Sequence, residues 1–504
     1  MELDRQVCSR ARLARDARFD GKFFIAVMTT GIYCRPVCRT RASKESNVRY
    51  FPTAAAAAEA GFRPCLRCRP ECSPGCAAWA GTQNTVSRGL RLISESGLED
   101  GGVEALADHL GVGARHLRRL FLRHLGATPR AVAQTRRLHF AKQLIDETSL
   151  PMGQVAIATG FGCVRRFNDA IRKVYQRTPT QIRRLAHQTV KQRENAYQFH
   201  LDFRPPYNWK RILEFLAARA TPGVESVQAG SYRRSISFNG HHGFVEVRFE
   251  ENRNALRAAV QFGDPRSLIF IIERLRAMFD LSADWSAICG TLRADPMLAR
   301  SVQAEAGLRV PGCWNGFELT VRAILGQQVS VKGATTLAGR IAEAFGQRFE
   351  PAPALTHLFP TPETLAGADL TRIGLTRARA DTVRALARAV CDGRIRFEGP
   401  VDFGALRVRL CEIPGIGQWT AEYVAMRALS DPDAFPAGDL HLRRKAGDLT
   451  QRELEKRSES WRPWRAYATM LLWQSVRDEA SVPPLRRKAG AHGHLEKRAT
   501  SLLE

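Results

Sequence analysis

In the second half of the chain, three segments alternate apolar and polar residues. Such alternation places every second side chain on one face, which is typical of strands. Residues 209–219 precede these three segments and show apolar residues at helical spacing. The alternating segments are SYRRSISF (231–238), GFVEVRFE (243–250) and ALRAAVQF (255–262). The pattern predicts a subdomain built on a β-sheet over residues 199–285.

After Asp295 the apolar spacing becomes helical, which predicts an all-helical domain over residues 286–480. Within it, the tight turn IPGIG lies between two apolar helical segments. Gly415 and Gly417 permit backbone angles closed to other residues and let another chain come close. The backbone N–H groups of such a turn can hold a phosphate. Asp439 follows about twenty residues later, so the pair of features suggests chemistry on a nucleotide held by the turn.

Residues 84–187 show no strand-like alternation, but they contain two similar segments about fifty residues apart. In each segment a small residue precedes a glycine by four positions, which lets one helix pack closely and turn into the next. Each segment ends in Thr-Pro, which stops one helix and starts another. We therefore expect two helix-turn-helix units whose second helices are basic. The small residues and glycines are Ala107 with Gly111 and Ala156 with Gly160, and the basic residues include Arg115, Arg118, Arg119, Arg165 and Arg166.

Two polar segments complete the organisation of the chain. Residues 188–198 are the best candidate linker. Residues 481–504 are polar and basic, and we expect them to be a disordered tail.

The formal net charge of +26 favours a polyanionic partner, and nucleic acid comes first. An anionic membrane surface is the competing interpretation. However, no apolar run is long enough to span a bilayer. The sequence MELDRQVCSRARLARD at the start lacks the apolar core of a signal peptide. We therefore expect no membrane partner and a cytoplasmic, nucleoid-associated protein.

Seven of the 12 cysteines lie before Ala77. Among them are two close pairs about thirty residues apart, which can close one tetrahedral site, and zinc is the usual ion for four thiolates. In a secreted chain such cysteines would suggest disulfides, and in a reducing cytosol they could be free thiols. We expect one Zn²⁺ in a module over residues 1–80, with no role assigned to Cys72 and Cys76. The pairs are Cys34 with Cys38 and Cys65 with Cys68.

Residues 410–442 resemble the helix-hairpin-helix and Gly/Pro-Asp loop of the DNA glycosylase superfamily. The resemblance extends from FRPPYNWKRILEFLAARA at Phe203 to RPWRAYATMLLW, which ends at Trp473, the full length of the 3-methyladenine DNA glycosylase II (AlkA) family. It implies a mixed sheet over 199–285 and double-stranded DNA with alkylated purines, of the 3-methyladenine and 7-methylguanine class, as substrate. Asp439 would then stay ionised and stabilise the oxocarbenium-like sugar as the N-glycosidic bond breaks.

Four aromatic residues could simply belong to the core, but the matching positions in the family line a pocket for a base flipped out of the duplex. Electron-rich rings favour a base made cationic by alkylation. The residues are Phe215, Trp419, Tyr423 and Trp473. From the positions that match Gln327 and Gln328, members of the family insert a side chain into the space that the flipped base leaves in the duplex. Gln328 takes the wedge position, where the type member has an apolar leucine.

The resemblance carries three further implications for the hairpin. Gly415 and Gly417 would contact the DNA backbone, and main-chain carbonyls near Cys411, Ile413 and Ile416 would hold a monovalent cation. Relatives that also cut the backbone carry a lysine two residues after the second glycine. Here that position is Trp419, so we expect base removal without Schiff-base lyase activity. No cysteine follows Asp439, so we expect no iron–sulfur cluster.

Two sequence motifs closely resemble the N-terminal domain of Ada-type methyl-phosphotriester repair proteins. They are TTGIYCRPVC and GFRPCLRC. The resemblance implies that Cys34 is both a zinc ligand and the nucleophile that takes a methyl group from a neutral DNA phosphotriester. Losing one unit of negative charge from the four-thiolate site should then strengthen DNA binding. Arginines around the ligands could hold the DNA backbone. They are Arg35, Arg39, Arg41, Arg63, Arg67 and Arg69.

The paired helix-turn-helix segments resemble the AraC-type DNA-binding domain, which places the second helix of each unit in the major groove. Ada-type proteins join the same two modules, and there methylation creates a transcriptional activator. The resemblance thus implies promoter DNA, and with it RNA polymerase, as partners.

The sequence as a whole predicts a multidomain α+β chain that resembles an Ada–AlkA fusion. It would consist of a small four-cysteine zinc module, an all-α double helix-turn-helix module, a mixed-sheet subdomain and an all-α helix-hairpin-helix glycosylase domain. The Pro-Cys-His-Arg site of O6-alkylguanine transferases is missing, so we expect no repair of that lesion. Two functions stay open: a glycosylase, or chiefly an alkylation-responsive regulator with a non-catalytic C-terminal half. Asp439 favours the enzyme, because a regulator would not need it.

Overall fold

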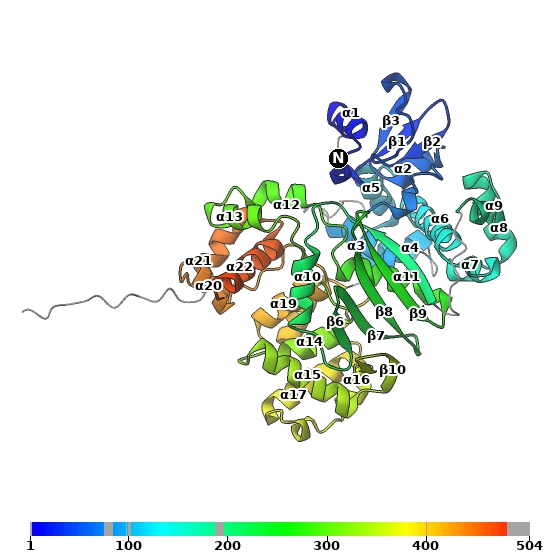
Figure 1. Cartoon of the computed structure of the whole chain (residues 1–504). Helices are drawn as coiled ribbons and strands as arrows, with labels where there is room; N and C mark the ends of the chain where they lie inside the picture. The colour runs from blue at the N-terminus through cyan, green and yellow to red at the C-terminus, as the bar shows by residue number, and fades with distance from the viewer. Residues whose placement is uncertain are drawn as a thin grey trace, which may run out of the picture.

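The computed structural model describes residues 3–74, 84–96, 98, 102–186, 196–399 and 401–480. The four-cysteine module lies at one end of the molecule and the helix-turn-helix module beside it (Figure 1). The sheet occupies the middle, and helices of the C-terminal domain cover the other end. This arrangement confirms the predicted multidomain α+β class. The linker predicted at 188–198 falls outside the described residues up to 195, as does the tail at 481–504.

The four-cysteine module (residues 3–74) is a four-stranded sheet of order β3-β1-β2-β4 with one helix before it and one within it. Strands β2 and β4 pair in parallel, with Tyr33 opposite Pro64. This register sets the ends of both strands side by side. The elements are α1 (Arg5–Ala14), β1 (Phe24–Val27), β2 (Ile32–Cys34), β3 (Val48–Phe51), α2 (Ala54–Glu59) and β4 (Arg63–Pro64).

The helix-turn-helix module contains two similar units joined by the long helix α6. Thr128 and Thr178 cap α6 and α9, and each is followed by proline at the first helical position, as the Thr-Pro pairs predict. Leu117 and Phe167 hold equivalent buried positions on the second helix of each unit, as do Phe121 and Ile171. The helices are α3 (Asn84–Ser96), α4 (Gly102–His109), α5 (Ala114–Leu125), α6 (Pro129–Glu147), α7 (Met152–Ala158), α8 (Val164–Tyr175) and α9 (Pro179–Leu185).

The central sheet has the order β5-β9-β8-β7-β6, and every neighbouring pair is antiparallel. The expectation of a mixed sheet is therefore wrong. Short turns connect β6 to β9 in succession, and such turns join only antiparallel neighbours, while β5 also runs antiparallel to β9. On β8, Val245 and Val247 are buried while Glu246 and Arg248 between them are half-buried, as the alternation predicts. The elements are β5 (Ala196–Asp202), α10 (Trp209–Ala217), β6 (Glu225–Gln228), β7 (Ser231–Phe238), β8 (His241–Glu250) and β9 (Ala255–Phe262).

The C-terminal domain is helical apart from one hairpin, which corrects the all-α expectation. Strands β10 (Arg348–Ala352) and β11 (Leu355–His357) pair there, and Thr356 N–H donates to Gly223 O at 2.7 Å, so the hairpin packs against the sheet subdomain. The helices are α11 (Leu268–Met278), α12 (Trp285–Leu292), α13 (Pro296–Ala304), α14 (Gly316–Leu325), α15 (Val331–Phe345), α16 (Pro362–Ala366), α17 (Arg377–Cys391), α18 (Phe403–Cys411), α19 (Gln418–Ala428), α20 (Leu440–Lys445), α21 (Gln451–Ser458) and α22 (Arg465–Ala480).

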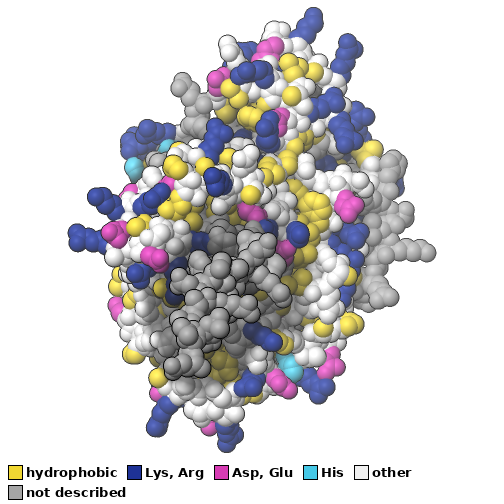
Figure 2. All heavy atoms as spheres, turned by 60° about the vertical axis from the view of Figure 1, so that its left-hand side comes forward, with side chains coloured by type: hydrophobic (Ala, Val, Ile, Leu, Met, Phe, Trp, Pro, Cys, Tyr) yellow, Lys and Arg dark blue, Asp and Glu magenta, His cyan; other side chains and the backbone are white. Residues whose placement is uncertain are grey.

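One apolar core runs from the second helix-turn-helix unit through the sheet into the C-terminal domain. The first unit has a separate core of its own. Figure 2 shows many Lys and Arg side chains on the upper part of one face, at the end where the four-cysteine module lies. Among the helices that the structure describes, none is both long enough and apolar enough to cross a membrane.

Candidate functional sites

Four cysteines converge in the N-terminal module. The parallel pairing of β2 with β4 brings Cys34 beside Cys65, and Cys38 and Cys68 follow in the next loops. Their sulfur atoms all lie within 4.8 Å of one another. Two sulfurs bound to one zinc at about 2.3 Å would be about 3.8 Å apart, so the four thiolates fit this ion. Cys72 is buried outside the cluster, and Cys76 lies outside the described residues.

Two of the six arginines expected to hold DNA beside this cluster are engaged elsewhere. Arg35 is only 6% exposed and pairs with Asp20 and Asp202. Arg69 pairs with Glu71, Asp146 and Glu147, the last two on α6. The expectation is therefore wrong for Arg35 and Arg69, because buried carboxylates hold their guanidinium groups. Arg39, Arg41 and Arg67 are exposed, and Arg63 is half-buried.

The basic residues predicted for DNA contact lie on equivalent helices of the two helix-turn-helix units. Helices α5 and α8 each bury one apolar face under the preceding helix and leave the other face to solvent. All five predicted arginines are on the exposed faces. They are Arg115, Arg118 and Arg119 on α5 and Arg165 and Arg166 on α8.

The hairpin at 413–417 requires glycine at position 415 because of the way the hairpin itself packs. Gly415 has a φ of +91°, and a Cβ there would lie 2.3 Å from Thr382 Oγ1. Thr382 Oγ1 in turn donates to Pro414 O at 2.9 Å. Gly417 is different, because it starts α19 with no atom within 4 Å of a Cβ placed on it. The second glycine therefore leaves room for another chain to approach.

The two adjacent glutamines have different environments. Gln327 Nε2 donates to Gly415 O at 2.9 Å and to Thr420 Oγ1 at 3.2 Å, so this side chain ties α14 to the hairpin. Arg379 Nη2 donates to Gln327 O at 2.7 Å. Gln328 is exposed and has a left-handed φ of +56°. Of the pair, only Gln328 projects from the surface.

Asp439 accepts four N–H hydrogen bonds. Its Oδ1 caps α20 by accepting from His441 N at 2.9 Å and Leu442 N at 3.0 Å. Its Oδ2 accepts from Trp419 Nε1 at 3.0 Å, and Trp473 Nε1 donates to Oδ1 at 3.3 Å. The carboxylate is thus both a helix cap and the meeting point of two aromatic side chains that the sequence assigns to the base pocket.

The four predicted pocket aromatics form one cluster. The rings of Trp419 and Tyr423 are stacked, with centroids 5.5 Å apart, and Tyr423 lies 6.3 Å from Trp473. Phe215 on α10 is buried, and the guanidinium of Arg427 lies over both its ring and that of Tyr423. Trp419 and Trp473 are only partly buried, so they are the accessible rings beside Asp439.

Sequence reasoning missed the arginines behind these rings. The guanidinium of Arg427 lies 4.8 Å from the Phe215 centroid and donates to Tyr423 Oη at 2.7 Å, and Arg219 lies 3.9 Å from the same phenyl ring. Burial alone would raise the pKa of Tyr423, but Arg427 and Arg219 outweigh it and the pKa is lowered. No local signal marks these arginines, because α10 and α19 meet only in the fold.

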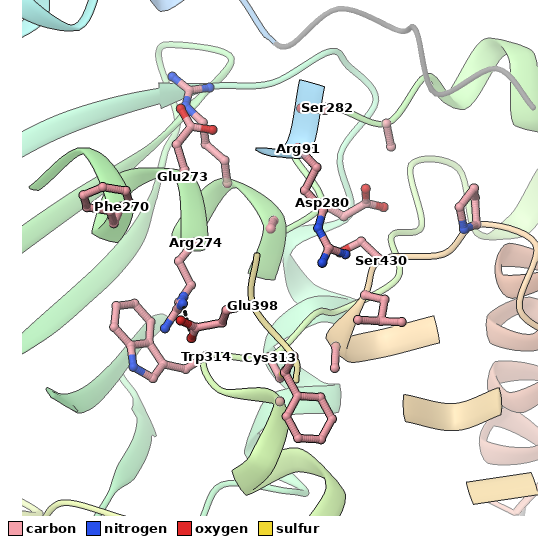
Figure 3. A pocket seen from close by; sticks show the side chains of 18 of the residues that line it. Arg91, Phe270, Glu273, Arg274, Asp280, Ser282, Cys313, Trp314, Glu398 and Ser430 are labelled. Carbon is pink, nitrogen blue, oxygen red and sulfur yellow. Dashed lines mark hydrogen bonds and ion pairs between the residues drawn. The ribbon is translucent and has the colours of Figure 1, made fainter. Parts of the chain in front are cut away.

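A separate cavity of about 350 Å³ lies where three parts of the chain meet. Arg91 of α3 reaches across it and donates to Gly399 O at 3.3 Å. Arg274 on α11 pairs with Glu398 beside the indole of Trp314 (Figure 3). Asp439 and the hairpin glycines do not line this space. It is a gap between modules, and none of the four clustered aromatic residues lines it.

Four family models match successive parts of the chain. They are the metal-binding domain of Ada (residues 7–71), a helix-turn-helix domain (106–185), the AlkA N-terminal domain (198–315) and the HhH-GPD superfamily base excision DNA repair protein (321–462). Together they cover all the modules described above.

Curated relatives agree with this order. A "Probable bifunctional transcriptional activator/DNA repair enzyme AlkA" of Mycobacterium tuberculosis is 40% identical over 97% of this chain and 100% of its own length. The DNA-3-methyladenine glycosylase 2 of Escherichia coli is 34% identical over 55% of this chain and 96% of its own. The bifunctional transcriptional activator/DNA repair enzyme Ada of Escherichia coli is 42% identical over 24% of this chain and 33% of its own. With a zinc-binding and a helix-turn-helix module joined to a DNA repair glycosylase, the chain belongs to the AlkA family of bifunctional transcriptional activator/DNA repair enzymes.

Proposed function

We propose that the C-terminal half excises alkylated purines, of the 3-methyladenine and 7-methylguanine class, by hydrolysing the N-glycosidic bond in double-stranded DNA. The observation that carries this proposal is the contact of Asp439 with the indole N–H groups of Trp419 and Trp473. A carboxylate fixed beside accessible aromatic rings suits a flipped base and the sugar attached to it.

Each group then has a distinct part in the reaction. Trp419 and Trp473 stack on the extruded base, with Gln328 as the wedge in the duplex. Asp439 stabilises the positive charge that develops on the sugar as the bond to the base breaks. An N3- or N7-alkylated purine already carries positive charge, so it leaves without protonation and one carboxylate is sufficient. Water then adds to the sugar carbon and gives an abasic site.

We further propose that the chain leaves the DNA backbone intact. A lyase needs an amine that attacks the sugar carbon. At the position two residues after Gly417 the chain has Trp419, whose indole N–H is bonded to Asp439 and is not nucleophilic. A monovalent cation on the hairpin carbonyls near Cys411, Ile413 and Ile416 would help to hold the DNA phosphate beside Gly417.

The test is release of free base from alkylated duplex DNA by the wild type and by Asp439→Asn. Asparagine is also a good N-cap, so the fold should survive the change. We expect the release rate to fall by about 100-fold or more. Asp295→Asn is a matched control, because Asp295 also caps a helix and accepts an indole N–H, from Trp461 at 2.8 Å. Equal rates for the wild type and Asp439→Asn would reject the proposed role.

The N-terminal module, in this proposal, accepts a methyl group at Cys34. Zinc, when bound by the four cysteines, keeps their thiolates ionised at neutral pH. The Cys34 sulfur forms a bond to the methyl carbon as the O–CH₃ bond of the phosphotriester breaks. The electron pair of that bond stays on oxygen and yields an ordinary phosphodiester anion, while the cluster loses one negative charge. Exposed Arg39, Arg41 and Arg67 would hold the neighbouring phosphates.

Methylation would then regulate the helix-turn-helix module. The less negative module repels DNA less, so promoter binding should tighten and RNA polymerase could be recruited. A gel shift that compares methylated with unmethylated protein on a promoter fragment tests this part, and unchanged binding would reject it. The alternative function, a regulator with a non-catalytic C-terminal half, requires that the wild type release no base.

A further inference from the structure

The arginine that follows Cys34 is bound by two carboxylates from different modules. Arg35 Nε donates to both oxygens of Asp20, at 3.0 and 3.1 Å. Arg35 Nη2 donates to Asp202 Oδ2 at 2.9 Å. Asp20 belongs to the four-cysteine module, whereas Asp202 is the last residue of β5 in the glycosylase half. All three side chains are at most 8% exposed.

The same arginine also contacts the second cysteine pair. Its backbone N–H donates to Cys68 Sγ at 3.4 Å, and its Nη1 donates to Cys68 O at 3.3 Å and Arg69 O at 3.4 Å. Arg35 O accepts from Cys38 N at 3.1 Å. Arg35 thus connects the loop that carries Cys34 and Cys38 to the loop that carries Cys68.

The neighbouring contacts fix Asp202 in place. Arg253 Nη2 donates to Asp202 Oδ1 at 3.1 Å. Arg204, which is 1% exposed, donates from Nε to Asp20 O at 2.7 Å. Gly21 lies against this junction, where an added Cβ would be 2.1 Å from Pro74 O. Asp20 and Asp202 each have at least one guanidinium partner here, so removing Asp202 leaves buried Arg35 with one carboxylate instead of two.

We propose that Asp202 is a positioning residue of the methyl-acceptor site, supplied by the glycosylase half of the chain. It holds Arg35, and Arg35 holds the two cysteine loops in the geometry that presents Cys34 to DNA. The zinc module of this chain is therefore incomplete without the glycosylase subdomain. The proposal rests on methyl acceptance by Cys34, which is part of the proposed function.

The experiment uses the full-length, zinc-loaded protein and a duplex with methyl phosphotriesters. The variants are Asp202→Asn, Asp202→Glu and Arg35→Lys. Lysine at position 35 keeps the positive charge but cannot span both carboxylates. Glu246→Gln is the matched control, because Glu246 pairs with Arg233 and Arg248 on the same sheet away from the cysteines. The readouts are the methylation rate of the Cys34 peptide by mass spectrometry and the thiolate-to-metal absorption of the Co²⁺-substituted protein. Base release from alkylated DNA reports the folding of the glycosylase half.

We expect Asp202→Asn and Arg35→Lys each to slow methyl transfer by about tenfold or more, the effect of losing a hydrogen bond to a charged group. Both should shift the Co²⁺ absorption and leave zinc content and base release unchanged. Asp202→Glu should recover part of the rate, and the double variant should be no slower than the slower single one. If Asp202→Asn fails to fold, Arg35→Lys decides.

Two outcomes distinguish a failure of the positioning role of Asp202 from a failure of methyl acceptance by Cys34. Full methylation rates and an unshifted Co²⁺ spectrum in both Asp202→Asn and Arg35→Lys would overturn the positioning role, with methyl acceptance intact. A wild type that takes up no methyl group would instead overturn the acceptor function of Cys34. In that case the Co²⁺ spectrum of the variants still decides whether Asp202 orders the cysteine cluster.

Discussion

Trp419 Nε1 donates to Asp439 Oδ2 at 3.0 Å, which joins the helix after the hairpin to the carboxylate proposed for catalysis. The two residues lie 20 positions apart, and α19 together with the loop before α20 brings them into contact. The same indole stacks on Tyr423. One side chain therefore stacks within the aromatic cluster and also donates a hydrogen bond to Asp439.

Replacing Trp419 with phenylalanine separates these two functions. Phenylalanine keeps a ring that can stack on Tyr423, but it removes the N–H donor. We expect the base-release rate to fall by about tenfold or more, because a hydrogen bond to a charged group is worth about 1.5–3 kcal/mol. The measurement is single-turnover base release from alkylated duplex. As a control, Trp461→Phe removes the equivalent indole hydrogen bond to Asp295 and should affect stability more than the base-release rate. Unchanged single-turnover release by Trp419→Phe would show that the Trp419 N–H does not assist Asp439.

Asp280 makes stability depend on pH. Burial raises the pKa of this carboxyl from 3.8 to about 6, although Arg309, Tyr467 and the Val310 N–H oppose the shift. The folded protein therefore holds the proton more tightly than the unfolded chain does. Stability should fall as the pH rises from about 4 to about 6, with a cost of about 3 kcal/mol complete above that range.

Asp280→Asn should remove this dependence. Asparagine tolerates the left-handed φ of +50° at this position and can still accept from Tyr467 Oη. Urea unfolding of both proteins at pH 4 and pH 7 would measure it, and the variant should gain about 3 kcal/mol over the wild type between the two values. Asp392→Asn, at an exposed position of the same domain, is the control. A constant difference between variant and wild type across this range would contradict the raised pKa.

Local patterns predicted the features that depend on neighbours in sequence. The alternation at 231–238 and 255–262 gave the bounds of β7 and β9, and the spacing of the cysteine pairs gave the cluster at Cys34. The antiparallel direction of the sheet and the β10–β11 hairpin depend on which strands pair, which alternation does not record. Arg35 and Asp202 lie 167 positions apart, so only the packing of two modules reveals that the arginine is unavailable to DNA.

Loss of zinc should unfold the N-terminal module selectively. Cys38→Ser removes one of the four ligands, and metal binding supplies much of the folding free energy of so small a unit. We expect the variant to lose bound zinc and to destabilise residues 3–74 by about 3 kcal/mol or more. Zinc analysis together with limited proteolysis of this module would measure both effects.

The glycosylase half provides an internal control for that experiment. None of the four clustered cysteines is among the groups proposed for base release. Base release by Cys38→Ser should stay within about twofold of the wild type, an activation difference of less than about 0.5 kcal/mol. Cys163→Ser changes an exposed cysteine outside the cluster and should retain zinc. Full zinc content in Cys38→Ser would mean that Cys38 is not a ligand.

Removing single arginines from the exposed faces of α5 and α8 should test whether and how each helix binds DNA. Arg118 on α5 and Arg166 on α8 are both exposed. If the arginine binds a phosphate, Arg118→Gln or Arg166→Gln should reduce the slope of log affinity against log salt by about 0.9. If it binds a base edge, the change should instead cost about 1–3 kcal/mol of binding free energy on the specific site and little on other sequences.

Binding titrations of promoter and unrelated duplexes at several salt concentrations distinguish these two modes of binding, with Arg348→Gln, on the β10–β11 hairpin, as the exposed control. If neither variant changes the affinity or its salt dependence, α5 and α8 are not the DNA-binding helices of this chain.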